Sequence, residues 1–135
     1  MRAKIGYWAV TGLFSAMMAA SAFAYLTGAP QMVAAFRHLG YPDYFRILLG
    51  TAKVLGVLAL VVPRVPQVLR EWAYAGFAIT TVSAAISHAV SGDPVAHIAA
   101  PLVAFALLLA SRILWRPGPV VSRPTDRVAG LPRTA

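Results

Sequence analysis

The sequence predicts an all-α integral membrane protein, a four-helix bundle with a short interfacial helix between the first two spans. Of its 135 residues, 59% are hydrophobic and 12% are charged, and the mean hydropathy is +0.70. That composition supplies too little polar surface for a soluble globule of this size. Each span needs roughly 20 residues to cross the hydrocarbon core. We therefore expect one membrane domain over residues 1–116.

Four apolar segments, separated by turn-forming Pro and Gly, are the expected spans. They cover about residues 6–26, 44–62, 72–90 and 96–115. The first also imitates a secretory signal peptide, because "MRAK" precedes an apolar run that ends in "AFA". Its apolar stretch is longer than the roughly 7 to 15 residues typical of such peptides, so we expect it to be retained as a helix.

The segment "PQMVAAFRHLG" between the first two spans is the expected interfacial helix. Pro30 suits a first helical position and Gly40 a C-terminal cap. Met32, Phe36 and Leu39 fall on one face, as in a helix that lies in the plane of the interface. Its length of about three turns cannot span the bilayer. An ordinary ordered loop is the alternative reading.

The twelve basic residues outnumber the four acidic ones, but they gather at helix ends and in the tail and do not alternate with aromatics on a soluble face. This distribution argues against a nucleic acid as partner. Arg37 and Arg46 lie toward one side of the membrane. Nine basic residues lie toward the other: Arg2, Lys4, Arg64, Arg70, Arg112, Arg116, Arg123, Arg127 and Arg133. The positive-inside rule therefore predicts cytoplasmic termini in an inner, or cell, membrane.

Two further features of the sequence are its C-terminal tail and its lack of cysteine. The tail, residues 117–135, is rich in Pro and Arg and has no apolar period, so we expect it to be disordered or to lie against anionic lipid. The sequence contains no cysteine, which excludes thiolate metal ligands, iron–sulfur clusters and thiol–disulfide exchange by this chain. Any redox role must use a bound cofactor or a partner.

Lys53 lies within the apolar run "LGTAKVLG", about 13 Å from either end of the second span. A lysine at that depth costs about 2.5 to 3.5 kcal/mol on insertion scales, so it requires a partner or a wet cavity. Gly50 and Gly56 would let a neighbouring helix or a ligand approach its backbone. The structural alternative is a lysine that snorkels to an interface and bonds a carbonyl or hydroxyl.

Polar residues gather where the third and fourth spans meet, at the expected outer mouth of the bundle. His88, Asp93 and His97 have the ligand types of a two-histidine, one-carboxylate metal site, but their spacing crosses a turn. We expect Asp93 to be a turn residue and His97 an interfacial one, and no metal site. We expect a ligand site above Lys53 in the outer half of the bundle, formed by Lys53, His88, Arg46, Asp93, Tyr44 and Gly50.

The sequence resembles the DoxX-like family of small four-helix membrane proteins over about residues 6–117. The resemblance rests on "FRHLGYPDYF", "LGTAKVLGVLALVVPRVP", "REWAYAGFAITTVSAAISHAVSGD" and "PLVAFALLLASRILWRP". The family takes its name from a membrane subunit associated with quinone-linked oxidation of sulfur compounds, and relatives are linked to redox stress. The resemblance implies a subunit of a membrane redox system that binds quinone or another small lipophilic molecule.

Three functions stay open on the sequence alone. The first is this ligand-binding subunit, in the lipid bilayer and beside a partner redox subunit, with quinone as the cofactor that the resemblance implies. The second is an intramembrane isomerase or oxidoreductase that uses Lys53 and His88 as acid and base. The third is a structural or assembly partner without a ligand. Homo-oligomerisation also stays open.

Overall fold

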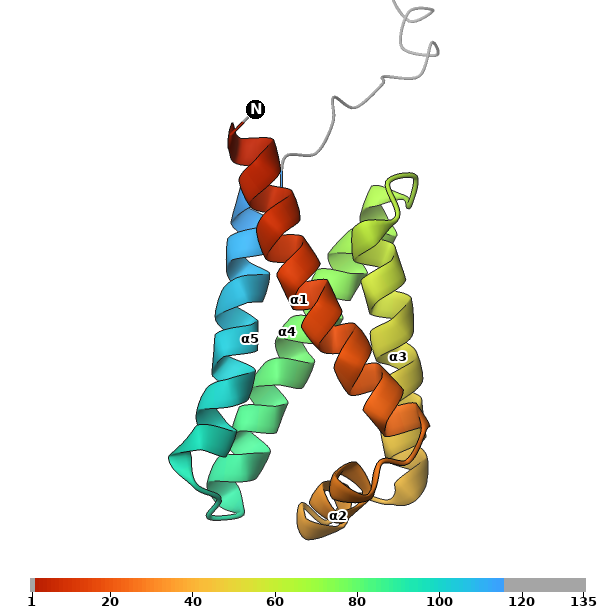
Figure 1. Ribbon diagram of the computed structural model, residues 1–135, viewed down its shortest axis with the longest axis vertical. Coiled ribbons are helices and arrows are strands. Elements are labelled where there is room, and N and C mark those ends of the chain that lie inside the picture. The colour runs from red at the N-terminus through yellow and green to blue at the C-terminus, as the bar shows by residue number, and fades with distance from the viewer. Residues whose placement is uncertain (1, 116–135) are drawn as a thin grey trace, which may run out of the picture.

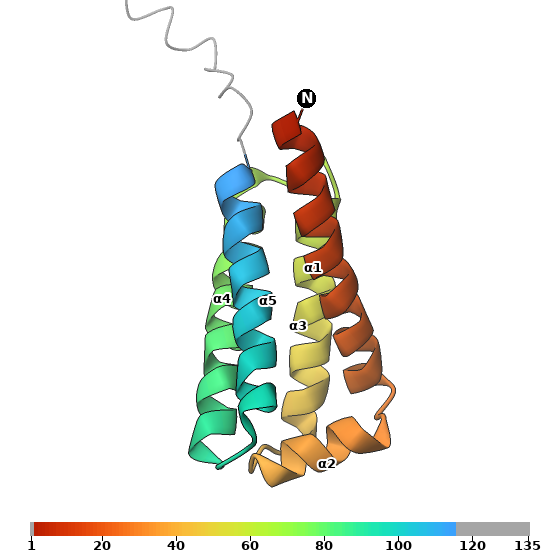
Figure 2. The same ribbon diagram turned by 60° about the vertical axis from the view of Figure 1, so that its left-hand side comes forward.

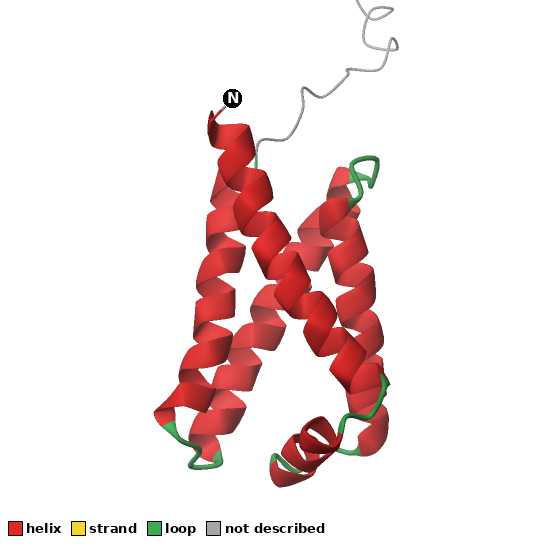
Figure 3. Ribbon diagram, viewed as in Figure 1, coloured by secondary structure: helices red, strands yellow, loops and turns green. Residues whose placement is uncertain are grey.

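The computed structural model describes residues 2–115, and it is helical throughout apart from short connections (Figure 3). Its helices, in chain order, are α1 (Arg2–Leu26), α2 (Pro30–His38), α3 (Asp43–Val61), α4 (Gln67–Val90) and α5 (Val95–Leu114). The predicted fold class and the predicted short helix are confirmed. The predicted basic tail, residues 117–135, lies outside the described residues.

Four of the helices described in residues 2–115 are long and apolar enough to cross a membrane. They are α1 from Lys4 onward, α3, α4 and α5, with lengths of 23, 19, 24 and 20 residues. Many large apolar side chains on their outer faces are exposed, including Phe23 at 71% and Ile79 at 69%. In water such surfaces would associate, whereas in a bilayer they face hydrocarbon. The chain is therefore a multi-pass membrane protein.

Each of the four spans packs against two others, and α2 lies across one end of the bundle (Figures 1 and 2). α1 packs along α3 and α5, and α4 packs along α5 and α3. The N-terminus and the end of α5 lie together at the opposite end from α2 (Figure 1). This arrangement follows from an even number of spans joined by short turns.

The helix α4 begins earlier than the sequence predicted. The apolar segment predicted a span from about residue 72, but the helix begins at Gln67. Pro66 occupies the N-cap with φ −53° and ψ 141°. A proline just before a helix needs no hydrogen-bond donor and has a suitable φ, so the helix can start directly after it.

Two connections at the α2 end of the bundle share one design. Gly40 ends α2 with φ +79° and Gly92 ends α4 with φ +72°, a left-handed conformation that favours glycine. In each case a proline then holds an extended backbone at the N-cap of the next helix, Pro42 before α3 and Pro94 before α5. The sequences "GYP" at residues 40–42 and "GDP" at residues 92–94 therefore form equivalent turns.

Apolar and small polar side chains together form the core. Its buried apolar members are Phe14, Met18, Leu60, Tyr74, Phe77, Ala104 and Leu108. Ser111 on α5 hydrogen-bonds both the Thr11 hydroxyl at 2.6 Å and the Tyr74 hydroxyl at 2.8 Å. Interhelical hydrogen bonds of this kind hold α1, α4 and α5 together where apolar contact alone gives little preference for one partner.

Candidate functional site

Lys53 lies in the middle of α3 and is buried, with 7% of its surface exposed. Its Nζ donates a hydrogen bond to Ser21 Oγ on α1 at 2.7 Å. The same nitrogen lies 4.1 Å from the centre of the Tyr25 ring, within the range of a cation–π contact. Among the described residues Lys53 forms no ion pair with a carboxylate. A hydroxyl and an aromatic face therefore stabilise a charge that has no counterion in this part of the chain.

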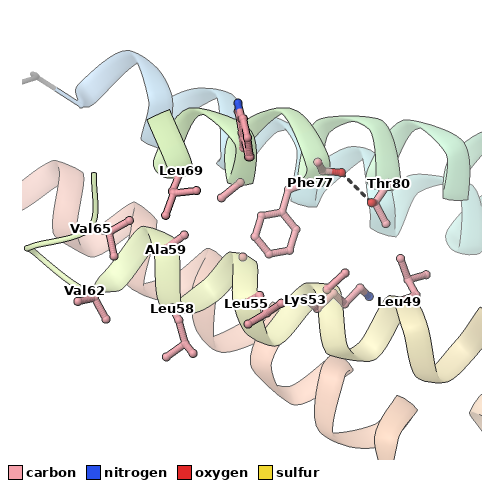
Figure 4. Close-up of a pocket in the computed structure, with 15 residues that line it drawn as sticks. Leu49, Lys53, Leu55, Leu58, Ala59, Val62, Val65, Leu69, Phe77 and Thr80 are labelled. Atoms are coloured by element: carbon pink, nitrogen blue, oxygen red, sulfur yellow. Dashed lines mark hydrogen bonds between the residues drawn. The ribbon is translucent and has the colours of Figure 1, made fainter. Parts of the chain in front are cut away.

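A groove of about 650 Å³ runs between α3 and α4, and Lys53 is one of its lining residues (Figure 4). Lys53 lies near one end of the groove with Leu49 and Thr80, while apolar side chains of Val62, Val65 and Leu69 form the other end. The Thr80 hydroxyl already donates to the Gly76 carbonyl at 2.7 Å. Lys53 is thus the charged residue among those that line an otherwise apolar groove, and its amine contacts α1.

The inner wall of the groove is closely packed and its outer side is exposed. Phe77 is 4% exposed, and its ring lies between the two helices and packs edge-on against Phe14 at 5.1 Å. A Cβ added at Gly56 would meet that ring at 2.6 Å, so Gly56 allows α3 to lie this close to Phe77. At the outer side Leu55 and Trp72 are 63% and 67% exposed. A molecule in the surrounding bilayer can therefore reach the groove laterally.

Gly50 and Arg46, which we expected in the ligand site, contact α1. A Cβ added at Gly50 would lie 3.0 Å from the Leu26 side chain and 3.1 Å from Tyr25, so Gly50 permits close packing of α3 on α1. Arg46 Nη1 donates to the carbonyl of Tyr25, and Arg46 Nε lies 3.6 Å from Asp43. A cation that bonds a last-turn carbonyl stabilises a helix C-terminus. Arg46 therefore caps α1.

The remaining predicted site residue on α3, Tyr44, is 70% exposed at the start of the helix and does not line the groove. The groove thus contains Lys53 alone of the six residues that we expected to bind a ligand. Arg46 and Gly50 lie beside Lys53 on the α1 side of the same helix. Whether any of them binds a ligand stays a prediction.

The other two expected residues, His88 and Asp93, belong to a separate cluster at the α2 end. We call His38, His88, Asp93 and His97 the rim cluster. Asp93 accepts hydrogen bonds from His88 Nδ1 at 2.6 Å and from His38 Nε2 at 2.8 Å. The rings of His88 and His97 lie edge to face, with centres 5.6 Å apart. Every histidine of the chain is therefore in this cluster.

The turn after α4 explains how Asp93 reaches His88. Because Gly92 is left-handed, the Asp93 N–H returns to the His88 carbonyl at 3.0 Å and places the two side chains side by side. The hydrogen bond from His88 holds the pKa of the Asp93 carboxyl below its usual range. Burial opposes this effect, and the hydrogen bond from His38 supports it. Asp93 is thus a turn residue, as expected, and also the acceptor that joins two histidines.

The expected single site is divided in two. Lys53 faces α1 and the α3–α4 groove, whereas the rim cluster lies at the ends of α2, α4 and α5. His88 is eight residues beyond Thr80, the groove residue nearest to it on α4, and this places it about 12 Å further along that helix axis. Its side chain is 22% exposed and turns toward Asp93. Lys53 and His88 consequently do not converge on one atom of a small ligand.

Three residues of these two clusters were not identified from the sequence as site residues or partners of Lys53. Ser21 and Tyr25 are four residues apart, so they share a face of α1, but small polar and aromatic residues also occur elsewhere on that helix. His38 is not among the six residues expected to bind a ligand. Its bond to Asp93 joins residues 55 positions apart, and no local pattern predicts such a contact.

Four long apolar helices, with a short helix across one end and a buried lysine in the third helix of the chain, define a small four-span membrane protein with an amine inside its bundle. A sequence profile described as the DoxX-like family matches residues 9–111. The chain therefore belongs to the DoxX-like family. Searches of curated proteins and of solved structures gave no significant match.

Proposed function

We propose that this protein binds a small lipophilic molecule of the quinone class in the α3–α4 groove, as a subunit of a membrane redox system. The observation that supports the proposal is the position of Lys53, a buried lysine that lines one end of an otherwise apolar groove. The groove volume of about 650 Å³ is typical of small-molecule sites, which range from roughly 300 to 1,000 Å³.

The amine has hydrogen-bonding capacity for a ligand. A lysine ammonium carries three donors, and among the described residues it forms one hydrogen bond, to Ser21. A quinone oxygen is an acceptor without a donor, so it matches the Lys53 end of the groove. Its apolar tail matches the other end, near Val62 and Leu69. A fixed positive charge beside the oxygen also stabilises the negative charge that develops on reduction.

The chain needs a partner for any electron transfer. It contains no cysteine, and quinone chemistry requires an electron donor and an acceptor that the protein's own side chains do not supply. The proposed role is therefore to hold and polarise the quinone while a second subunit exchanges electrons with it. Family membership supports this choice among lipophilic ligands.

The two alternatives from the sequence make different demands on the structure. An intramembrane enzyme with Lys53 and His88 as an acid–base pair needs both groups near one reacting atom, and they lie in separate clusters. A purely structural protein needs no groove beside its buried amine. Turnover of a lipophilic substrate by the purified chain alone would favour the enzyme.

Equilibrium binding of a short-chain ubiquinone analogue to the protein in nanodiscs tests the proposal. We expect saturable binding, and an affinity at least about tenfold lower for Lys53→Met, because a hydrogen bond to a charged group contributes about 1.5 to 3 kcal/mol. Thr51→Val is the matched control, since Thr51 is exposed on the same helix and donates to the Ile47 carbonyl. Equal affinities in wild type and Lys53→Met would overturn the proposal.

A further inference from the structure

We propose that the rim cluster is a metal site, in which His88, Asp93 and His97 bind a zinc-class divalent cation and His38 orients the carboxylate. This inference is independent of the ligand in the α3–α4 groove. It rests on the convergence of all three histidines of the chain and one aspartate from four segments of the fold: the end of α2, the last turn of α4, the α4–α5 turn and the first turn of α5.

The distances suit a three-ligand site. One ligand atom from each of His88, Asp93 and His97 lies within 4.8 Å of the other two. Ligand atoms about 2.0 to 2.2 Å from a tetrahedral Zn²⁺ are about 3.3 to 3.6 Å apart, so the side chains must adjust slightly, and the His88–Asp93 pair, now 2.6 Å apart, must open. His97 is exposed, and among the described residues its side chain forms no hydrogen bond that would resist this movement.

The ligand types also suit zinc. Two neutral imidazoles and one carboxylate are a common set of protein ligands for Zn²⁺, with a fourth position left for water. His88 Nδ1 and Asp93 Oδ2, now 2.6 Å apart, share a proton that the cation would replace. When the metal binds Nδ1, that proton moves to Nε2 of the same ring, so His88 stays a neutral imidazole and no oxidation state changes.

His38 supplies the supporting contact that metal sites use. Its Nε2 donates to Asp93 Oδ1 at 2.8 Å, while the other carboxylate oxygen faces His88. A hydrogen bond to the second oxygen fixes the orientation of a ligating carboxylate. The same bond connects α2 to the α4–α5 turn, so a bound cation would hold the short helix across the end of the bundle.

Zinc titration of the purified protein tests this inference. The protein is purified through a tag without histidine, treated with a chelator in detergent and titrated with Zn²⁺ by calorimetry. We expect one cation per chain and a higher Tm with Zn²⁺, because a cation that binds only the folded state stabilises it. Co²⁺ at the same site should give the visible absorption of a four- or five-coordinate ion, and Mg²⁺ should not compete.

Variants decide between a built site and loose surface binding. His97→Ala and Asp93→Asn should each lower the zinc affinity at least about tenfold and abolish the Tm increase, and His38→Ala should lower the affinity about 10- to 100-fold. Asp43→Asn, which removes a carboxylate that is 56% exposed at the same end of the bundle, should bind zinc as wild type does. Absence of saturable binding, or wild-type affinity in His97→Ala with wild-type helicity, would overturn the proposal.

Discussion

At the scale of single residues, Lys53 shows how a membrane protein can retain a charge near the centre of a span. Burying the lysine costs about 2.5 to 3.5 kcal/mol. An interhelical hydrogen bond such as that to Ser21 returns about 0.6 kcal/mol on average, and a desolvated cation–π contact such as that to Tyr25 returns about 2 kcal/mol. Together, these two contacts at most cancel the cost of burying the lysine. Lys53 therefore contributes no net stability that would explain its presence.

The variant Lys53→Met should consequently be as stable as wild type or more stable. Methionine keeps most of the side-chain length and removes the charge, so the lost contacts and the relieved burial cost nearly cancel or favour the variant. The measurement is the Tm of both proteins in the same detergent. A clearly lower Tm for Lys53→Met would assign Lys53 to structure.

A double-mutant cycle with Ser21 isolates the hydrogen bond. In the wild-type background Ser21→Ala leaves the amine without its acceptor and should cost about 1 to 3 kcal/mol. In the Lys53→Met background the same change should cost far less, because no donor remains. Equal costs in both backgrounds would contradict the partnership of these two residues.

The sequence predicts that Lys53 is unusual, but it does not predict its partners. Its depth follows from counting residues along an apolar segment, and its need for a partner follows from the insertion cost. Ser21 and Tyr25 become partners through the register of α1 against α3, which is set by the approach of Gly50 to Leu26 and Tyr25. Packing of that kind depends on the side chains of two helices at once.

At the scale of helices, the contact between Gly56 and Phe77 determines how closely α3 and α4 approach. We expect Gly56→Ala to destabilise the protein by about 1 to 3 kcal/mol, because the new Cβ meets the buried Phe77 ring at 2.6 Å and the ring is held against Phe14. Tm measured in detergent reports the loss.

Gly76→Ala is the control for that prediction. Gly76 lines the same groove from α4, but a Cβ added there meets nothing within 4 Å. Its Tm should hold or rise, since alanine has a higher helix propensity than glycine by about 1 kcal/mol. If the two alanine variants behave alike, the close approach at Gly56 does not limit the packing of α3 on α4.

Helix positions were easier to predict than the contacts between helices. Apolar length located all four spans, and Pro30 with Gly40 located α2. The start of α4 differs because the apolar pattern begins near Trp72, whereas the helix itself begins directly after Pro66 at the N-cap. The outer polar residues were expected in one site because they share a depth, but depth does not give the direction in which each helix turns its side chains.

At the scale of the whole molecule, the even number of spans places the described ends of the chain on one side of the membrane. We propose that this side is cytoplasmic in a cell membrane, because nine of the twelve basic residues lie toward it. A reporter fused after Ala135 should therefore behave as cytoplasmic. Periplasmic activity there would reverse the orientation and move the rim cluster to the cytoplasmic face.

The most direct test of the central claim is the location of a bound quinone. A photoreactive ubiquinone analogue in nanodiscs should label peptides from α3 and α4 that line the groove near Lys53, Leu49 and Thr80. Excess unlabelled quinone should compete for this labelling, and Lys53→Met should reduce it strongly. Labelling spread evenly over the lipid-facing surfaces of all four spans, or unchanged in Lys53→Met, would contradict a quinone site at Lys53.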